Sequence, residues 1–206
     1  FLNADTEVKS DFLSNVIEEF KVKKFGAVGL KLYNTDGTFQ LSFWKENTFF
    51  NEIKNKKEEK YFKEREAKYI EEKETEFNSI KEVDWVTGAA LIIKKEVFIN
   101  TGEFDDDFFL FYEDADLCKR LKSNGLPVYF YPHCKIIHHK GENVNMDFKS
   151  NSYFYSKQSQ LLYYKKHNNF VNNLLLRVYL FSKFTFLYLL TFKKINLDIV
   201  KLTLKF

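Results

Sequence analysis

Hydrophobic and polar positions along the first 45 residues predict one helix and one hairpin. Between residues 10 and 23, apolar side chains recur at spacings of three and four, which is typical of an amphipathic helix with Ser10 or the next residue as its cap. Residues 26–33 form a predicted short strand, and residues 38–44 a predicted return strand. The Asn-Thr-Asp-Gly turn signal at 34–37 indicates that these two strands form a hairpin.

The first residues of the chain are also predicted to belong to the sheet. Phe1 and Leu2 are expected to end a buried strand, which would place the loop 3–6 at its carboxyl end. In open α/β sheets that edge is where ligands bind. The chain starts without a methionine, so we expect a fragment or a processed product.

Residues 45–80 differ in composition from the rest of the chain, because charges of both signs are dense there. Phe62, Tyr69, Ile70 and Phe77 give this region only a thin apolar stripe. The pattern favours a solvated helix with neighbouring ion pairs over an arm that binds nucleic acid.

Strands and helices alternate in the region that follows. Residues 83–93 predict a strand, a turn and a second strand, and residues 94–101 a short helix closed by a glycine. A helix over 115–123 and two strands, 128–131 and 135–138, separated by a proline, complete the pattern. Alternation of this kind is typical of an α/β fold.

The C-terminal part of the chain is predicted to be helical. Residues 153–167 are amphipathic and aromatic, and residues 174–192 are almost continuously apolar. The apolar run is near the length that spans a bilayer, but Arg177 and Lys183 inside it are costly there. A helix on or partly in the membrane surface is therefore favoured, since two lysines follow it, and a plain buried helix is the alternative.

Composition limits the classes of protein that fit. The 206 residues are enough for one domain with a sizeable core, and 24 Phe and 12 Tyr make that core aromatic. A net charge of +3 without a clustered basic face argues against a nucleic-acid partner. Two cysteines, Cys118 and Cys134, do not form a disulfide framework and suit a reducing compartment.

An aromatic run at 108–112 ends abruptly in two carboxylates, Glu113 and Asp114, directly before a predicted helix. One interpretation is structural: Asp114 caps the helix, and Asp116 complements the helix dipole and pairs with Arg120 four residues on. The other interpretation is chemical. Two adjacent acids at the end of a buried segment destabilise the fold unless they are paired, cap a helix or take part in a reaction.

Four sequence blocks carry a resemblance to a known family. The chain resembles the second half of a family 2 glycosyltransferase, in its bacterial rhamnosyltransferase-like branch. The blocks are L-N-A-D-T at 2–6, V-D-W-V-T-G-A-A-L-I-I-K-K-E-V-F at 83–98, G-E-F-D-D-D-F-F-L-F-Y-E-D-A-D-L-C-K-R at 102–120 and Y-P-H-C-K-I-I-H-H-K-G at 131–141. Ala4 stands where the family usually has proline, and Glu103 where it usually has a second glycine.

The resemblance implies a divalent cation, Mg²⁺ or Mn²⁺, held by Asp5 and His138, with Asn3 near the nucleotide sugar. Oxygen ligands that share substrate phosphates suit such a cation. Taken alone, Asn3 and Asp5 are typical of a turn or cap. A zinc site built from the histidines and Cys134 is the weaker alternative, because adjacent ligand pairs fit tetrahedral zinc poorly.

The resemblance also implies roles for the two acids. Asp114 would be the base that takes the proton of the acceptor hydroxyl, and Glu113 would orient the acceptor or the base. Trp85 and Gly88 would line the acceptor side, where an indole offers a flat face to a sugar ring. For Trp85 a plain core position remains the alternative.

These observations predict an α/β fold of the GT-A type, a Rossmann-like mixed sheet truncated at its N-terminus. Residues 1–150, with the charged insert at about 45–80, would form the glycosyltransferase part, and residues 151–206 a membrane-associated helical tail. The expected activity is inverting, metal-assisted transfer from a nucleotide-diphosphate sugar to a glycan or lipid-linked acceptor, at the cytoplasmic face of the inner membrane. The isolated chain is expected to be inactive. The alternative is a non-catalytic membrane-associated or protein-binding module.

Overall fold

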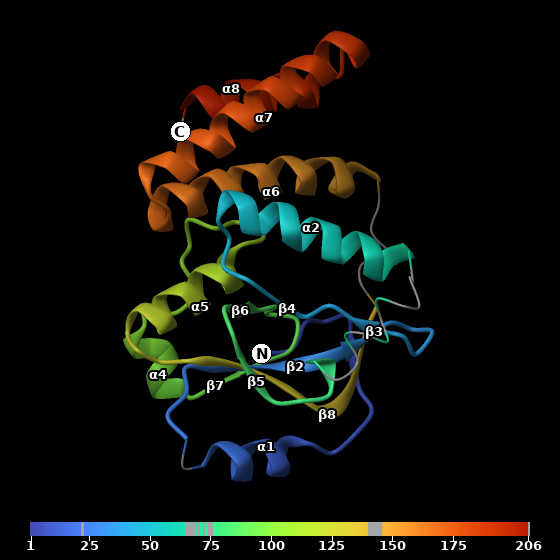
Figure 1. Cartoon of the computed structure of the whole chain (residues 1–206), viewed down its shortest axis with the longest axis vertical. Coiled ribbons are helices and arrows are strands. Elements are labelled where there is room, and N and C mark those ends of the chain that lie inside the picture. Colours follow the sequence, from blue (N-terminus) through green and yellow to red (C-terminus); the bar gives the residue numbers. More distant parts are fainter. Residues whose placement is uncertain are drawn as a thin grey trace. The chain divides into compact units, whose positions relative to one another are not determined.

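The computed structural model describes residues 1–21, 23–64, 69, 71, 73, 76–139 and 146–205 (Figure 1). Contacts divide the chain into two compact units. The first unit comprises Phe1–Glu46, Asn51–Phe104 and Asp114–Glu142, and the second comprises Asn47–Phe50, Asp105–Glu113 and Asn143–Phe206.

The first unit is built on a mixed sheet in which β1, β8, β2 and β3 lie side by side in that order. β5 pairs with β8, β7 pairs with β2, and within the described residues only the β2–β8 pairing is parallel. The strands are β1 (Thr6–Val8), β2 (Ala27–Tyr33), β3 (Phe39–Gln40), β5 (Lys81–Val83), β7 (Leu91–Ile93) and β8 (Val128–His138). This curled mixed sheet with its helices is an α/β fold, consistent with a Rossmann-like GT-A fragment that has a helical tail, so the predicted fold class is confirmed.

Alternation along β2 places two apolar clusters on opposite faces of the sheet. Val28 and Leu30 pack in one cluster with residues of α1 (Leu13–Phe20). Ala27 belongs to the other cluster, together with Leu117 of α5 (Glu113–Ser123). Because successive strand residues point to opposite faces, α1 and α5 cover the two sides of the sheet, as Figure 1 shows.

The helix α1 is shorter than the predicted 10–23. Ser10 does not cap it, because the Ser10 hydroxyl accepts a hydrogen bond from the Lys135 N–H at 2.8 Å. This bond holds the residues before α1 against β8. Phe12 takes the cap position without a side-chain hydrogen bond. The helix is held by burial of one face rather than by its cap, and the residues buried on that face are Val16 and Phe20.

The predicted return strand over 38–44 is divided between two sheets. Its first part, β3, pairs with β2, whereas its second part, β4 (Phe43–Trp44), pairs with β6 (Trp85–Val86) in a separate two-stranded sheet. The Thr87 N–H donates to the Ser42 carbonyl at 3.0 Å, which holds the chain where it changes sheets. The hairpin prediction is therefore right for β3 and wrong for β4.

Two strands predicted on either side of Pro132 form one strand, β8. Leu30 pairs with Tyr131 and Leu32 with Ile136, so two steps along β2 correspond to five along β8. Pro132 lies in this irregularity, where its missing N–H interrupts no regular ladder. The bulge allows the strand to continue.

The first two residues are less buried than predicted. Leu2 forms an isolated bridge with Ala90, and the Leu91 N–H donates to the Phe1 carbonyl at 3.0 Å. Phe1 and Leu2 nevertheless remain 52% and 54% exposed, so the expectation of a buried strand end is wrong. Only one edge of this segment is paired in the described part of the chain.

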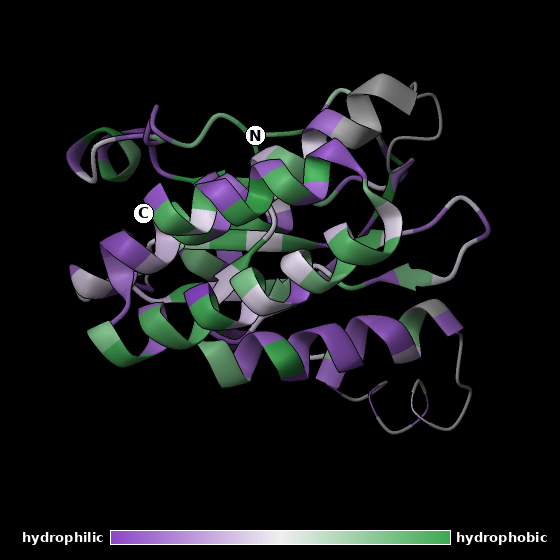
Figure 2. Ribbon diagram, turned by 90° about the horizontal axis from the view of Figure 1, so that it is seen from above, coloured by the Kyte–Doolittle hydropathy of each residue, from purple (hydrophilic) through white to green (hydrophobic). Residues whose placement is uncertain are grey.

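The remaining helices differ in polarity and length. α2 (Phe49–Glu64) lies in the charged region and is largely purple in Figure 2. The rest of the predicted charged helix, including Ile70, falls partly outside the described residues. α4 (Lys95–Asn100) is closed by Gly102 as predicted, with a φ of 89°.

The second unit contains three helices in its C-terminal part: α6 (Met146–His167), α7 (Phe170–Thr191) and α8 (Lys194–Lys205). α6 begins earlier than the predicted residue 153. The start of α7 is fixed by Asn169, whose side chain accepts a hydrogen bond from the Asn172 N–H at 2.9 Å. The helical tail is thus divided by a capped break.

Candidate active site

Backbone pairing brings Asp5 and His138 together although they are far apart in the sequence. β1 runs antiparallel to β8 with Thr6 opposite His138, and the His139 N–H donates to the Asp5 carbonyl at 2.9 Å. His138 Nε2 lies 3.3 Å from Asp5 Oδ1. The carboxyl ends of the parallel pair β2 and β8 meet at this edge, where ligands bind in α/β sheets.

The donor set fits a divalent cation in part. An imidazole nitrogen and a carboxylate oxygen are suitable ligands for Mn²⁺, and the oxygen also suits Mg²⁺. Among the described residues, no group of three or more His, Cys, Asp and Glu side chains could hold a metal ion. Oxygens of water or of substrate phosphates would suit the remaining positions around a cation held by Asp5 and His138.

The zinc alternative finds no support in the described part of the chain. Cys134 is buried, its Sγ lies 3.7 Å from the Lys31 carbonyl, and burial raises the pKa of this thiol to about 11. The rings of His133 and Tyr131 are nearly perpendicular, with centroids 5.4 Å apart. A thiol with a raised pKa is a poor source of the thiolate that binds zinc.

Asp114 is held by backbone groups from two elements. Its Oδ2 accepts a hydrogen bond from the Gly88 N–H at 2.9 Å, and its Oδ1 accepts one from the Ala115 N–H at 2.8 Å. Loss of contact with water raises the pKa of this carboxyl group, and the backbone N–H groups oppose that change. α5 begins at Glu113, so Asp114 lies in the first turn and is not the predicted cap.

Two aromatic residues before α5 have unusual backbone conformations. Phe111 and Tyr112 have φ values of 67° and 68°, in the left-handed region that non-glycine residues rarely adopt. Such strain persists where the surrounding structure imposes it, and it is common at functional sites. Hydrophobic patterning carries no signal for it, because the run at 108–112 only indicated burial.

The loop between β6 and β7 also contacts the start of the chain. The Asn3 N–H donates to the Ala89 carbonyl at 3.0 Å, one residue from Gly88. Asn3 and Asp5 stand two residues apart in a turn that the Thr6 hydroxyl closes on the Asn3 carbonyl at 2.6 Å. This turn links the backbone around Gly88 to the pair formed by Asp5 and His138.

The predicted close approach of backbone at Gly88 leaves more room than the approach at Gly29, which was not predicted. A Cβ added to Gly88 would lie 3.5 Å from Asp114 Cβ, which is an ordinary contact. A Cβ on Gly29 would lie 2.3 Å from Val86 Cβ. Gly29 is therefore required for β6 to cross β2, and β6 carries Trp85 into the site region.

Trp85 is neither plain core nor an open platform. Its indole stacks on Trp44 with ring centroids 4.3 Å apart and an angle of 18° between the planes. The Trp85 Nε1–H donates to the Lys45 carbonyl at 3.0 Å. One face of the ring is thus covered, and the side chain as a whole is half-buried. Glu113, the other predicted site residue, is the first residue of α5 and is also half-buried.

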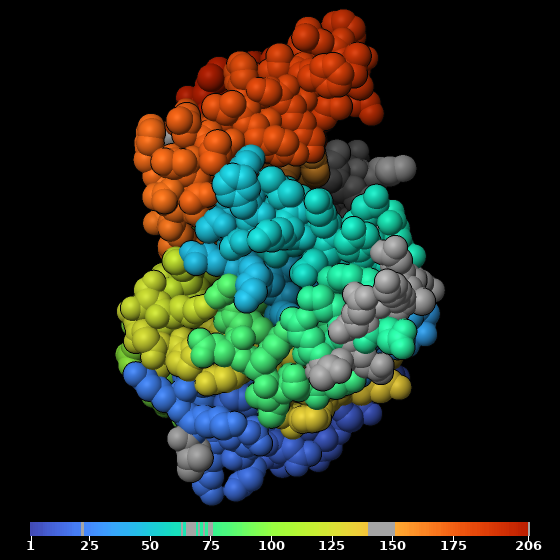
Figure 3. Space-filling model, viewed as in Figure 1, coloured from blue at the N-terminus to red at the C-terminus, as the bar shows by residue number. Residues whose placement is uncertain are grey.

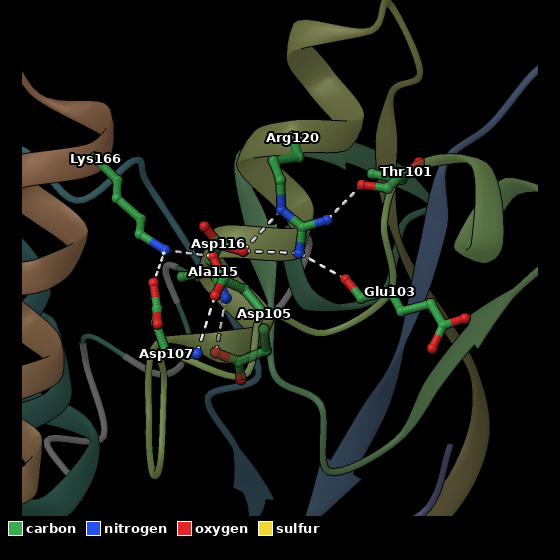
Figure 4. Close-up of polar contacts among 9 residues, drawn as sticks. Thr101, Glu103, Asp105, Asp107, Ala115, Asp116, Arg120 and Lys166 are labelled. Carbon is green, nitrogen blue, oxygen red and sulfur yellow. Dashed lines mark hydrogen bonds and ion pairs between the residues drawn. The ribbon is translucent and has the colours of Figure 1, made fainter.

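Arg120 organises the loop before α5, and its predicted ion pair with Asp116 is confirmed. Arg120 Nη2 lies 2.7 Å from the buried Asp116 carboxylate. The same guanidinium donates to the carbonyls of Thr101 and Glu103, each at 2.6 Å (Figure 4). Glu103 has a φ of 57°, which explains why glycine suits this position.

The aspartate run 105–107 forms a turn fixed by a lysine within the second unit. Lys166 Nζ lies 2.6 Å from Asp105 Oδ2 and 2.7 Å from Asp107 Oδ2, and the Asp107 N–H donates to Asp105 Oδ1 (Figure 4). These contacts are structural and leave Asp105 and Asp107 paired with a lysine of the chain itself.

No family model matches the chain. It is 27% identical over 88 residues, 43% of this chain and 29% of the relative, to an N-acetylglucosaminyl-diphospho-decaprenol L-rhamnosyltransferase of Mycobacterium tuberculosis. It is 30% identical over 81 residues to the rhamnosyltransferase WbbL of Escherichia coli, covering 39% of this chain and 30% of that protein. The match to the O-antigen biosynthesis protein RfbC of Myxococcus xanthus is 27% identical over 161 residues, 71% of this chain and 11% of RfbC.

The matches thus span less than a third of the length of these curated relatives. Two of the three named relatives are rhamnosyltransferases, and the third is named for O-antigen biosynthesis. The similarity to them supports a glycosyltransferase family for this chain.

Proposed function

We propose that this chain is part of a glycosyltransferase that moves a sugar from a nucleotide-diphosphate donor to a hydroxyl of a lipid-linked or glycan acceptor in cell-surface polysaccharide synthesis. The observation that carries the proposal is the similarity to rhamnosyltransferases from two bacteria and to an O-antigen biosynthesis protein from a third. The placement of acids at the Gly88 loop and at the carboxyl edge of β2 and β8 agrees with it.

In this proposal Asp114 is the base. The acceptor O–H gives its proton to an Asp114 oxygen while the acceptor oxygen forms a bond to the anomeric carbon. The bond from that carbon to the diphosphate breaks in the same step, and the nucleoside diphosphate leaves with its electron pair. One displacement from the opposite face inverts the anomeric configuration. A base with a raised pKa accepts the proton more readily than an ordinary carboxylate.

Other residues of the first unit would bind and orient the substrates. Asp5 and His138 would hold Mg²⁺ or Mn²⁺, which when bound supplies positive charge beside the departing diphosphate. Asn3 would lie near the nucleotide sugar, and Gly88 keeps Asp114 in place through its N–H. Trp85, with one face stacked on Trp44, would offer an edge or its other face to the acceptor.

Glu113, next to the base, would orient the acceptor or the base. It begins the helix whose second residue is Asp114, so the two carboxyl groups come from one helical turn. A change at Glu113 is therefore expected to act through the acceptor rather than through donor binding.

We further propose that α7 contacts the cytoplasmic face of the membrane. Within the described residues, α7 is the one helix long and apolar enough to cross a membrane. Much of the apolar surface of α7 is exposed. Figure 3 draws this helix in orange. Arg177 inside the helix donates to the Thr203 carbonyl of α8 at 3.1 Å, and Lys193 and Lys194 follow it. Peripheral binding to anionic lipid suits this arrangement better than spanning.

A transfer assay with the full-length protein tests the proposed function. Nucleoside-diphosphate rhamnose and other nucleotide sugars are offered with an N-acetylglucosaminyl-diphospho-polyprenol acceptor and Mg²⁺ or Mn²⁺, and products are identified by mass spectrometry. We expect a product with one added sugar and inverted configuration. Absence of both transfer and donor binding would overturn the proposal. Binding without transfer would instead favour the non-catalytic module.

A further inference from the structure

A continuous chain of side-chain hydrogen bonds runs from His138 into the β2–β3 hairpin. His138 Nδ1 lies 2.8 Å from Gln40 Oε1, and Gln40 Nε2 donates to Asn34 Oδ1, also at 2.8 Å. Asn34 Nδ2 donates to Thr38 Oγ1 at 3.0 Å, and the Thr38 hydroxyl donates to Asp36 Oδ1 at 2.6 Å. Five side chains are linked in series.

The chemistry of the last group sets the direction of the whole chain. An ionised Asp36 carboxylate can only accept, so the Thr38 hydroxyl donates its one hydrogen there. The Thr38 oxygen then accepts from the amide nitrogen of Asn34, which leaves the Asn34 oxygen to accept from Gln40. The orientations of both amides follow from this order.

Gln40 consequently presents an acceptor to the imidazole. Its nitrogen donates both to Asn34 Oδ1 and, at 3.3 Å, to the carbonyl of His138 itself. A reversed amide would place oxygen against both of those oxygens. Because Gln40 Oε1 can only accept, the imidazole carries a hydrogen on Nδ1, and Nε2 is the ring nitrogen that faces Asp5.

The hairpin is rigid enough to impose this orientation. Gln40 is only 6% exposed and lies in β3 opposite Leu32 of β2. The Asn34 N–H donates to the Thr38 carbonyl at 2.7 Å, and the turn is completed by Gly37 at a φ of 82°. A buried glutamine with both ends bonded is costly to displace, since every partner would lose its bond.

We propose that the hairpin 34–40 is a positioning device for His138, with Gln40 as the residue that keeps a hydrogen on Nδ1. Gln40 thereby turns Nε2 toward Asp5, where this nitrogen would bind a divalent cation. The metal-binding consequence rests on the proposed function, whereas the hydrogen on Nδ1 is a property of this chain without metal or substrate. Hydrogen-bonded partners of this kind orient a ligating imidazole and raise its affinity for metal.

The tautomer can be measured directly by NMR. Full-length protein labelled with ¹⁵N is examined without metal, and His138→Gln assigns the signals of His138. We expect Nδ1 to be protonated in the wild type. In Gln40→Leu the hydrogen should move toward Nε2, and Mn²⁺ affinity should fall by about 10–100-fold. A wild-type ring without a hydrogen on Nδ1, or an Nδ1 hydrogen that is unchanged in Gln40→Leu, would overturn the proposal.

Two further variants keep the test decisive if Gln40→Leu does not fold. Thr38→Val breaks the chain of bonds two side chains away and should shift the tautomer in the same direction, whereas Thr38→Ser keeps the hydroxyl and should restore it. Gln160→Leu is the matched control, because Gln160 is also buried but bonds Lys157 in the second unit. A tautomer change in Gln160→Leu as large as in Thr38→Val would count against the hairpin.

The outcome also separates this inference from the proposed function. An Nδ1-protonated ring that responds to Gln40 and Thr38, in a protein that transfers no sugar, would support the positioning device and reject glycosyl transfer. Transfer activity in a protein whose His138 ring has no hydrogen on Nδ1 would support glycosyl transfer and reject the positioning device.

Discussion

The Gly88 N–H donates to Asp114 Oδ2 at 2.9 Å and so ties the first turn of α5 to the loop between β6 and β7. The other oxygen, Oδ1, accepts from the Ala115 N–H at 2.8 Å. Both oxygens are therefore used as acceptors. A helix cap needs one such bond, whereas a base whose two oxygens are held by backbone groups from two elements is fixed in position and direction.

Replacing Asp114 by asparagine should remove the base. Turnover of the full-length protein is expected to fall by about 10²–10⁴-fold, because base catalysis contributes about that much. Asparagine also replaces one acceptor oxygen by an N–H group that would face a backbone N–H, so a stability loss of about 1–3 kcal/mol is expected as well. Sugar transfer is measured below the melting transition, per folded molecule.

The matched control is Asp116→Asn, two residues further along α5. Asp116 is buried and paired with Arg120, so this change should destabilise the protein without removing the base. If Asp116→Asn loses as much turnover per folded molecule as Asp114→Asn, the catalytic role of Asp114 is wrong.

The raised pKa of Asp114 predicts an unusual acid limb in the rate profile. Burial raises this pKa above the ordinary 3.8, so the carboxylate is lost at a higher pH than most aspartates on acidification. As a base it should give a kcat/KM that falls with a midpoint above 3.8. The effect of pH on stability runs in the opposite direction to its effect on the rate. A carboxyl pKa that is raised in the folded state favours folding at low pH, and this contribution to stability is lost as the pH rises. An acid limb at or below 3.8 would exclude Asp114 as the group that titrates.

The sequence predicted the sheet and the grouping of elements better than the hydrogen bonds that orient the candidate site residues. α1, β2 and α4 follow from local periodicity and from the glycine at 102, because their signals lie within a few residues. The division of the return strand and the continuity of β8 do not follow from local sequence. The first depends on the pairing of β4 with β6, and the second on the pairing of β8 with β2, and in both cases the partner is distant in the sequence.

The same limit applies to the candidate site. Family blocks led to Asp5, His138 and Asp114, but no short motif indicated that Gln40 contacts His138. The positive φ values of Phe111 and Tyr112 were also not predictable from the sequence, because aromatic residues indicate burial and not a left-handed backbone. Turn chemistry was visible in the Asn-Thr-Asp-Gly sequence, and only its link to the histidine required the fold.

Glycine at position 103 should stabilise the protein slightly. Glu103 has a φ of 57° and an exposed side chain, and its carbonyl accepts from Arg120. Glu103→Gly removes left-handed backbone strain, which stabilises the folded state by about 1–2 kcal/mol. Glycine also gives the unfolded chain more conformational freedom, which destabilises the folded state by about 0.4–1 kcal/mol. We expect the melting temperature to rise by about 1–3 °C.

Glu96→Gly is the control for this change, since it removes the same side chain from the first turn of α4. Helical backbone disfavours glycine by about 1 kcal/mol, so this variant should melt at a lower temperature. Equal shifts of both variants in one direction would show that charge or side-chain loss, not backbone conformation, governs the effect.

The last prediction concerns the exposed apolar surface of α7. Deleting the tail would be ambiguous, because Leu176 and Phe184 are buried and their loss would expose core. Phe186, Leu189 and Leu190 are instead 62%, 63% and 63% exposed and lie within two helical turns. Replacing all three by glutamine should keep the fold and weaken vesicle binding by more than about 100-fold, since each buried apolar side chain contributes about 1.5–3 kcal/mol.

Co-sedimentation with vesicles containing phosphatidylglycerol measures this binding, and circular dichroism checks that the helices persist. The control replaces three exposed aliphatic residues of the first unit, Leu13, Ile17 and Ile99, by glutamine. That variant should bind vesicles like the wild type, because it removes similar apolar surface elsewhere. Binding should also weaken when the vesicles lack anionic lipid, since Lys193 and Lys194 follow the helix. If the α7 variant is folded and still sediments as the wild type does, α7 is not the membrane contact.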